Sequence, residues 1–147
     1  MRLDRNERVS NFSPEVVADI FRGFALYSLS ASPESGRLYE KIAQSLSIAK
    51  EKIYITNGVT EGVKILFETL TNPGENVIVL DPTYPIYSIY AKIYQTEYRK
   101  FGYREDLMPD WDSFYRGIDT NTTLVIIPNP NLPIESMFTI EEVRNMA

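Results

Sequence analysis

Along residues 53–146, short runs of β-forming residues alternate with longer segments in which apolar residues recur at helical spacing. Two of the short runs, Val77–Leu80 and Leu124–Ile127, are apolar throughout, as expected of strands buried on both faces. Such alternation is typical of α/β proteins with a parallel sheet. We therefore predict an α/β fold with a mainly parallel sheet, with strands at 53–56, 77–80, 96–103 and 124–127 and helices at 60–70, 86–94, 111–118 and 139–146.

The residues before this region predict an arm followed by two helices. Residues 1–13 are polar and mixed in charge, which indicates an arm outside the core. Ser13-Pro14-Glu15 is typical of a helix start, with a hydroxyl N-cap, a proline in the first turn and an acidic residue at the positive end of the helix dipole. A second helix is predicted where Leu38, Ile42 and Leu46 share one face.

Composition excludes several classes of chemistry. The 147 residues contain no cysteine and no histidine, which excludes thiolate nucleophiles, disulfides and every triad or metal site that needs sulfur or imidazole. A net charge of −5 argues against a nucleic-acid or anionic membrane partner, no apolar run is long enough to span a bilayer, and no secretory signal is visible. We therefore expect a cytoplasmic protein without a metal, in which catalysis would use Asp, Glu, Lys, Tyr or a cofactor.

The first junction between a predicted strand and helix is a candidate anion site. Gly58-Val-Thr-Glu-Gly62 would leave the backbone N–H groups of Val59 and Thr60 unpaired at the positive end of a helix dipole. The alternative is an ordinary helix start at which Asn57 or Thr60 caps the helix. The segment matches neither the P-loop nor the dinucleotide-binding glycine pattern, so standard nucleotide sites are excluded.

Two further junctions offer an aromatic ring and carboxamides. In Asp81-Pro-Thr-Tyr-Pro85, Tyr84 could lie flat against a planar ligand or pack within the protein. In Asn129-Pro-Asn-Leu-Pro133, two asparagines could bond a hydroxyl or phenolate, or could stabilise a proline-rich turn. Carboxyl ends of parallel strands are where α/β proteins bind ligands.

Five segments in order resemble one family. They are Leu3-Asp-Arg-Asn-Glu7, Ile55-Thr-Asn-Gly-Val-Thr-Glu-Gly62, Asn72-Pro-Gly-Glu-Asn-Val-Ile-Val79, Pro82-Thr-Tyr-Pro-Ile-Tyr87 and Pro128-Asn-Pro-Asn131. Their order and spacing resemble those of the class I and II aminotransferases, which are fold-type I enzymes dependent on pyridoxal 5′-phosphate (PLP). Within that family the resemblance is to the histidinol-phosphate aminotransferase group.

The resemblance implies a three-layer α/β/α architecture, with residues 1–13 as an N-terminal arm and residues 14–147 as the N-terminal part of the PLP-transferase large domain. It also implies PLP as cofactor and a homodimer with sites at the subunit interface. By motif position it implies that Gly58, Val59 and Thr60 bind the cofactor phosphate and that Tyr84 stacks on the cofactor ring. It also implies that Asn131 bonds the phenolic oxygen of that ring and that Asn6 and Glu7 lie beside the substrate.

The chain departs from the family pattern at three points. Leu132 stands where the family has its cofactor-binding asparagine, so that Asn131 would serve only if the loop shifts by one residue. Ser30 stands where the family often has a tyrosine that reaches the partner subunit's phosphate. None of the lysines lies in the family's Schiff-base context, which predicts an N-terminal fragment with no catalytic residue of its own.

The resemblance implies that the whole protein transfers an amino group between an amino acid, or related amine, and a 2-oxo acid. A PLP-dependent decarboxylase or lyase of the same fold is an alternative, since it would share these N-terminal motifs. A non-catalytic scaffold that has lost PLP is a second alternative, which Leu132 and Ser30 would both suit.

Overall fold

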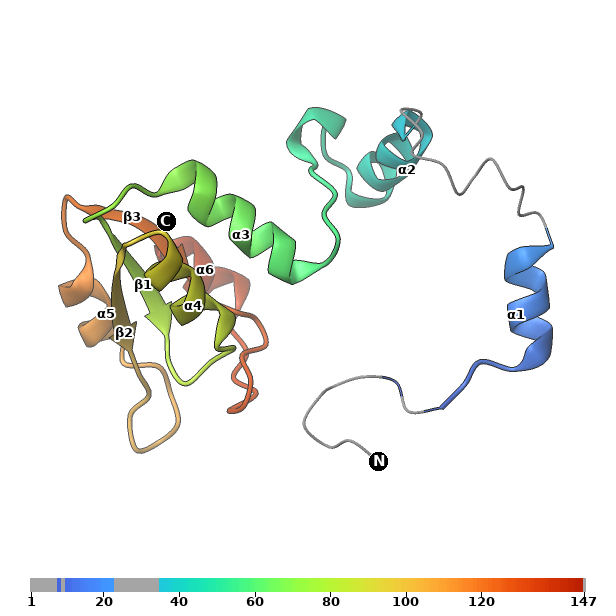
Figure 1. The fold of residues 1–147 in the computed structure, drawn as a ribbon. Coiled ribbons are helices and arrows are strands. Elements are labelled where there is room, and N and C mark those ends of the chain that lie inside the picture. The colour runs from blue at the N-terminus through green and yellow to red at the C-terminus, as the bar shows by residue number, and fades with distance from the viewer. Residues whose placement is uncertain (1–7, 9, 23–34, 147) are drawn as a thin grey trace. The chain divides into compact units, whose positions relative to one another are not determined.

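Three parallel strands form a single sheet in the computed structural model, which describes residues 8, 10–22 and 35–146. Strand β1 (Asn76–Leu80) lies in the middle, between β2 (Glu97–Phe101) and β3 (Thr122–Ile126). Both pairings are parallel, with Val77 opposite Tyr98 on one side and Leu124 on the other. The predicted α/β fold with a parallel sheet is confirmed (Figure 1).

Helices cover both faces of this sheet because successive residues of β1 point to opposite sides. Val77 and Val79 pack against α3 (Val59–Leu70) and α4 (Ile86–Ile93). Ile78 and Leu80 pack on the other face, with rings from β2, from α5 (Trp111–Gly117) and from the loop before α6 (Ile140–Met146). All five residues of β1 are buried, which confirms the prediction for the apolar run Val77–Leu80 and adds Asn76. The architecture is three layers, α/β/α (Figure 1).

The chain divides into two units, Met1–Tyr54 and Ile55–Ala147. The first contains α1 (Pro14–Phe21), α2 (Gly36–Leu46) and a short 3₁₀ turn at Lys50–Lys52. The second contains the sheet and its covering helices. Ser30, Asn6 and Glu7 lie outside the described residues, so the expectations for them stay predictions.

Side chains set the helix starts that the sequence indicated. The Ser13 hydroxyl accepts a hydrogen bond from Val16 N–H at 3.4 Å, which confirms the predicted start of α1. At α6, Thr139 and Glu142 bond each other's backbone N–H groups, at 3.2 and 2.8 Å, in a reciprocal capping box. Both caps satisfy N–H groups that a helix terminus leaves unpaired.

Three of the four predicted strands differ from the structure. Residues 53–56 are not a strand, because no described strand pairs with them and an extended backbone alone forms no ladder. The predicted strand 96–103 ends at Phe101, since Gly102 C=O instead accepts Asp110 N–H at 2.9 Å and the chain folds back on itself. Strand β3 is only partly buried, so the prediction that it is covered on both faces is wrong.

A network of polar side chains joins the three strands near the amino-terminal end of the sheet. Asn76 is 1% exposed and donates to Asp119 at 2.9 Å, while Thr122 donates to Asn76 at 2.7 Å. Arg99 on β2 donates to the other Asp119 oxygen at 2.6 Å. Asp119 therefore connects one residue from each strand, directly or through Asn76. Hydrogen bonds from Arg99, Asn76 and the Asn121 backbone lower the pKa of Asp119 from 3.8 to about 2.

This low pKa predicts an acid-sensitive contribution to stability. In the unfolded chain the carboxyl group returns to its ordinary pKa of 3.8, so the unfolded state binds the proton first. The stabilisation is therefore complete above that pKa and is lost as the pH falls toward 2. Urea midpoints measured from pH 6 to pH 2 should fall less steeply in Asp119→Asn than in the wild type. Glu105→Gln, in an exposed loop, should keep the wild-type slope; equal slopes for all three proteins would contradict the assignment.

Candidate cofactor site

The start of α3 presents unpaired backbone donors. Gly58 is the N-cap, with φ 86°, a left-handed value that favours glycine, and no side chain caps the helix. The N–H groups of Val59 and Thr60 have no acceptor in the part of the chain that the structure describes. Val59 is 70% exposed. The capping alternative for Asn57 and Thr60 is therefore not realised, and the two amides lie open to an anion.

The hydroxyl of Thr60 lies beside that of Tyr84. The two oxygens are 3.5 Å apart, although the residues belong to α3 and to the loop that follows β1. Tyr84 is half-exposed, and its ring meets the Tyr87 ring edge-on at 6.1 Å. About half of the Tyr84 side chain thus remains exposed at the carboxyl edge of the sheet. The structure brings together the two junctions that the sequence placed 24 residues apart.

Tyr84 forms part of an open cavity of about 380 Å³. This volume lies in the range of small-molecule sites, and its position at the carboxyl edge of the sheet is the usual one in α/β proteins. The loops after β1 and β3 supply the lining residues, which are Thr83, Tyr84, Pro85, Pro128, Pro130, Asn131, Leu132 and Pro133.

Asn131 is part of the protein interior. It is 0% exposed, and its amide N–H₂ donates to Pro82 C=O at 2.9 Å and to the Tyr103 hydroxyl at 2.7 Å. Its carbonyl accepts the Thr83 hydroxyl at 2.7 Å. Both donors are thus used within the chain, and the expectation that Asn131 donates to a ring oxygen stays a prediction. The loop has the hydrogen bonding of a proline-rich turn stabilised by asparagine, which was the alternative interpretation.

Asn129 has the same internal role. Its side chain donates to Phe138 C=O at 3.2 Å and accepts Phe138 N–H at 3.1 Å. Leu132, in contrast, is 45% exposed and faces the cavity. The third junction therefore offers the cavity an apolar side chain and no free carboxamide.

Three residues of this region were not identified from the sequence: Thr83, Tyr103 and Ser136. Tyr103 and Ser136 hydroxyls lie 2.7 Å apart, and Asn131 joins them to Thr83. Thr83 is a polar residue within a proline-rich motif, which was the available signal. Tyr103 and Ser136 gave none, because 33 residues separate them and only the fold makes them neighbours.

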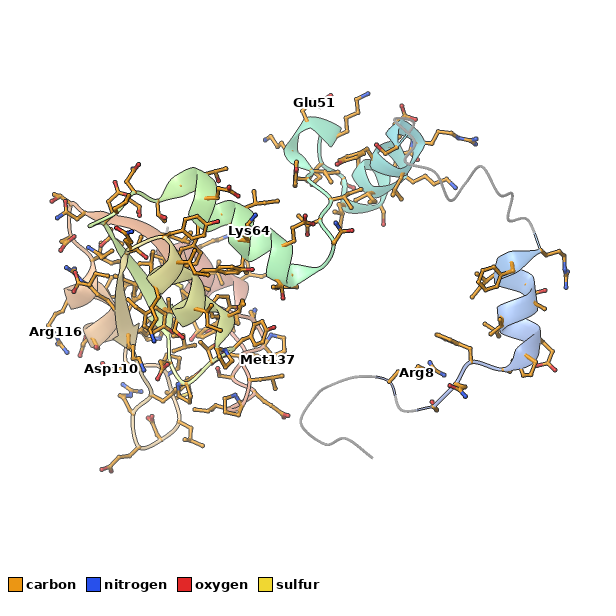
Figure 2. The ribbon with its side chains drawn as sticks, viewed as in Figure 1. Arg8, Glu51, Lys64, Asp110, Arg116 and Met137 are labelled. Carbon is orange, nitrogen blue, oxygen red and sulfur yellow. The ribbon has the colours of Figure 1, made fainter. Side chains whose placement is uncertain are left out.

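Neither of the two lysines within α3 and α4, Lys64 and Lys92, lines the cavity. Lys64 extends from α3 and pairs with Glu68 at 3.6 Å on the exposed surface (Figure 2). Lys92 is exposed on α4. Both lysines therefore belong to solvated helix faces.

Parallel strands covered by helices define an α/β protein, and the cavity lies at the carboxyl edge of the strands, where such proteins usually bind their ligands. Residues 13–147 match the family described as aminotransferase class I and II. The chain belongs to that family, whose members use pyridoxal 5′-phosphate.

Curated relatives extend the match over nearly the whole chain. Histidinol-phosphate aminotransferase 1 of Carboxydothermus hydrogenoformans is 28% identical over 99% of this chain and 43% of its own length. Histidinol-phosphate aminotransferase of Clostridium botulinum is 30% identical over 99% of this chain and 40% of its own. The chain thus spans about two fifths of the length of these relatives.

Solved structures agree on the fold. Alanine aminotransferase from Pyrococcus furiosus superposes with a TM-score of 0.68 at 25% identity, covering 89% of this chain and 36% of that one. A putative aminotransferase from Burkholderia pseudomallei gives a TM-score of 0.73 at 18% identity, covering 96% and 42%. The latter likeness concerns the fold alone.

The residues present fit one part of PLP and not another. Open amides at α3 and the Thr60 hydroxyl suit a phosphate group, and the Tyr84 ring suits a planar ring beside it. In the cavity that Tyr84 lines, the Leu132 side chain offers no hydrogen bond to a phenolic oxygen. Within the described ranges, no group of three or more acidic, Cys or His side chains is placed to hold a metal, and no helix is long and apolar enough to cross a membrane.

Proposed function

We propose that the whole protein transfers an amino group between an amino acid, or related amine, and a 2-oxo acid, with PLP as cofactor. The observation that supports this most strongly is the pairing of open amides at the start of α3 with the half-exposed Tyr84 ring at the cavity, in a chain of this family. Histidinol-phosphate aminotransferases among the relatives favour an amine substrate of that kind.

In this proposal the residues of the chain bind and orient the cofactor. The amides of Val59 and Thr60 and the Thr60 hydroxyl hold the phosphate, and Gly58 gives the backbone the turn that exposes them. The Tyr84 ring fixes the plane of the cofactor. When bound, PLP supplies an electron sink that withdraws charge from the reacting carbon of the substrate.

The remaining catalytic groups are proposed to lie outside these residues. Lys64 and Lys92 are placed on exposed helix faces and not at the cavity, which supports a Schiff-base lysine elsewhere in the whole protein. Asn6 and Glu7 are proposed to contact the substrate. A homodimer in the cytoplasm, without nucleic-acid or membrane partners, is proposed from the family resemblance and the net charge of −5.

The product of the reaction tests the proposal against its alternative. The whole protein, with PLP added, is given an amino acid or histidinol phosphate and a 2-oxo acid. Amino transfer converts the donor to its oxo compound and the acceptor to an amino acid, in equal amounts. A decarboxylase of the same fold would instead release carbon dioxide and an amine, and a scaffold without PLP would release nothing.

A substitution at Thr60 tests the phosphate site directly. Thr60→Val removes the hydroxyl and keeps the shape, so the affinity for pyridoxamine 5′-phosphate should fall by about 10- to 100-fold, as for loss of one hydrogen bond to a charged group. Thr60→Ser keeps the hydroxyl and should bind within about threefold of the wild type. Isothermal titration calorimetry measures both. Equal affinities in Thr60→Val and Thr60→Ser would reject the phosphate site.

A further inference from the structure

Asn57 is the only one of the nine asparagines in the sequence that is followed by glycine. The backbone nitrogen of the following residue can attack the side-chain carbon Cγ of an asparagine and displace the amide nitrogen as ammonia. Glycine favours this attack, because it has no Cβ to block the approach and its backbone reaches conformations closed to other residues. Proline prevents the attack, because its nitrogen carries no hydrogen, and proline follows both Asn72 and Asn129.

The structure leaves both reacting groups of Asn57-Gly58 free. Both residues are exposed. Among the described residues, the Asn57 side chain has no hydrogen-bond partner and the Gly58 N–H group has no acceptor. Glu61 accepts a hydrogen bond from the backbone N–H of Asn57, which restrains the main chain but not the side chain. The Asn57 side chain is therefore free to rotate toward the Gly58 nitrogen without breaking a hydrogen bond that the structure describes.

Other asparagines lack one or more of these conditions. Asn76 and Asn131 are buried, and both donate side-chain hydrogen bonds within the chain. Asn121 and Asn145 are exposed, but the residue that follows each of them carries a side chain. Among the asparagines that the structure describes, Asn57 is therefore the one that is exposed, unpaired at its side chain and followed by glycine.

We propose that Asn57 is a site of spontaneous deamidation in this protein. The Gly58 nitrogen loses its proton to water and forms a bond to Cγ of Asn57. The bond from Cγ to the amide nitrogen breaks, and ammonia leaves. Water then opens the resulting cyclic imide at either carbonyl, which yields aspartate or isoaspartate at position 57. The overall reaction consumes water, releases ammonia and replaces a neutral side chain by a carboxylate, with no change of oxidation state.

The new carboxylate changes the charge at the start of α3. Residue 57 lies directly before the N-cap Gly58, and the amides of Val59 and Thr60 that follow are open. A fixed negative charge at position 57 repels an anion that binds those amides. Deamidation therefore weakens anion binding at α3 as the protein ages. This consequence rests on the proposed function, whereas the chemical step at Asn57 does not.

Peptide mass spectrometry of the whole protein, stored at neutral pH without cofactor, measures the reaction at each asparagine. Asn57 should lose its amide at least about 10-fold faster than Asn121 and Asn145, because a side chain on the following residue hinders the attack. Gly58→Ala should slow the loss at Asn57 by about 10-fold or more for the same reason. Gly74→Ala is the matched control, since Gly74 has a φ of 87° against 86° for Gly58 and both have open space where a Cβ would lie. It should keep the wild-type rate.

Similar rates at Asn57, Asn121 and Asn145, or a wild-type rate in Gly58→Ala, would overturn the inference. The consequence is measured separately, by calorimetry with pyridoxamine 5′-phosphate. Asn57→Asp carries the charge of the product and should bind about 2- to 5-fold more weakly than the wild type, as for like charges separated by water. Asn57→Gln stays neutral and should bind as the wild type does.

The two measurements fail in different ways. Equal affinities in Asn57→Asp and Asn57→Gln would disprove the effect of deamidation on anion binding. Failure of the wild type to bind pyridoxamine 5′-phosphate would instead contradict the proposed function, and the rates at Asn57 would still decide whether the chemical step occurs.

Discussion

Phe67→Ala is expected to lower the free energy of unfolding by about 3–5 kcal/mol, the usual effect of removing a buried phenylalanine ring. Phe67 is fully buried in α3, and its ring lies 6.1 Å from those of Tyr90 and Tyr94 in α4 and the turn after it. Because a typical domain is stable by only 5–15 kcal/mol, this loss should leave a fraction of the chains unfolded at ambient temperature.

The control for Phe67→Ala is a substitution at an exposed position of the same helix, α3. Leu70 is 50% exposed, so Leu70→Ala should cost less than about 1 kcal/mol by urea denaturation. Phe67→Leu refills much of the volume and should lie between the two. Similar losses for Phe67→Ala and Leu70→Ala would show that α3 does not depend on this contact. Phe67 also anchors α3, the helix whose first turn holds the open amides.

Asn131→Ala is expected to cost about 2–4 kcal/mol, since it removes a fully buried side chain that makes three hydrogen bonds to part-buried groups. Pro82 C=O and the Thr83 hydroxyl would be left unpaired, and Tyr103 would keep only Ser136. Urea denaturation of this variant and of Asn145→Ala, at an exposed helix position, measures the difference. Asn145→Ala should change the stability by less than about 0.5 kcal/mol.

A double-mutant cycle with Thr83→Val separates the network from a simple cavity effect. Thr83 and Asn131 contact each other at 2.7 Å, so their losses should not add, with a coupling of about 0.5–3 kcal/mol. Additive losses would show that the two side chains act independently. Strong coupling would mean that one network positions both loops that line the cavity.

Much of the fold could be predicted from local pattern. The apolar run at Val77–Leu80 is buried throughout, and the capping residues at Ser13 and Thr139 begin helices where the sequence placed them. These features depend on neighbouring residues only, so a periodicity or a cap reveals them. Residues 53–56 show the limit of this reasoning: they have strand composition, yet no strand lies beside them to complete a ladder.

The candidate site divides in the same way. Gly58, Val59 and Thr60 lie within one turn of a helix start, and the sequence alone indicated their open amides. Asn131 was predicted to face a ligand, but its hydrogen bonds reach Pro82 and Tyr103, 49 and 28 residues away. The sequence motif shows that an asparagine side chain is present, but it does not show which distant residues form hydrogen bonds with that side chain.

The sequence by itself determined most of the strands and helices and the helix starts, because these follow from short-range spacing, and the order of five motifs along the chain carried its resemblance to the family. Only the tertiary structure decided that the Thr60 and Tyr84 hydroxyls meet at 3.5 Å, that Asn131 is buried and that Leu132 faces the cavity. The physical reason is that parallel pairing brings loops distant in the chain to one edge of the sheet, where buried polar groups must find partners before any can serve a ligand.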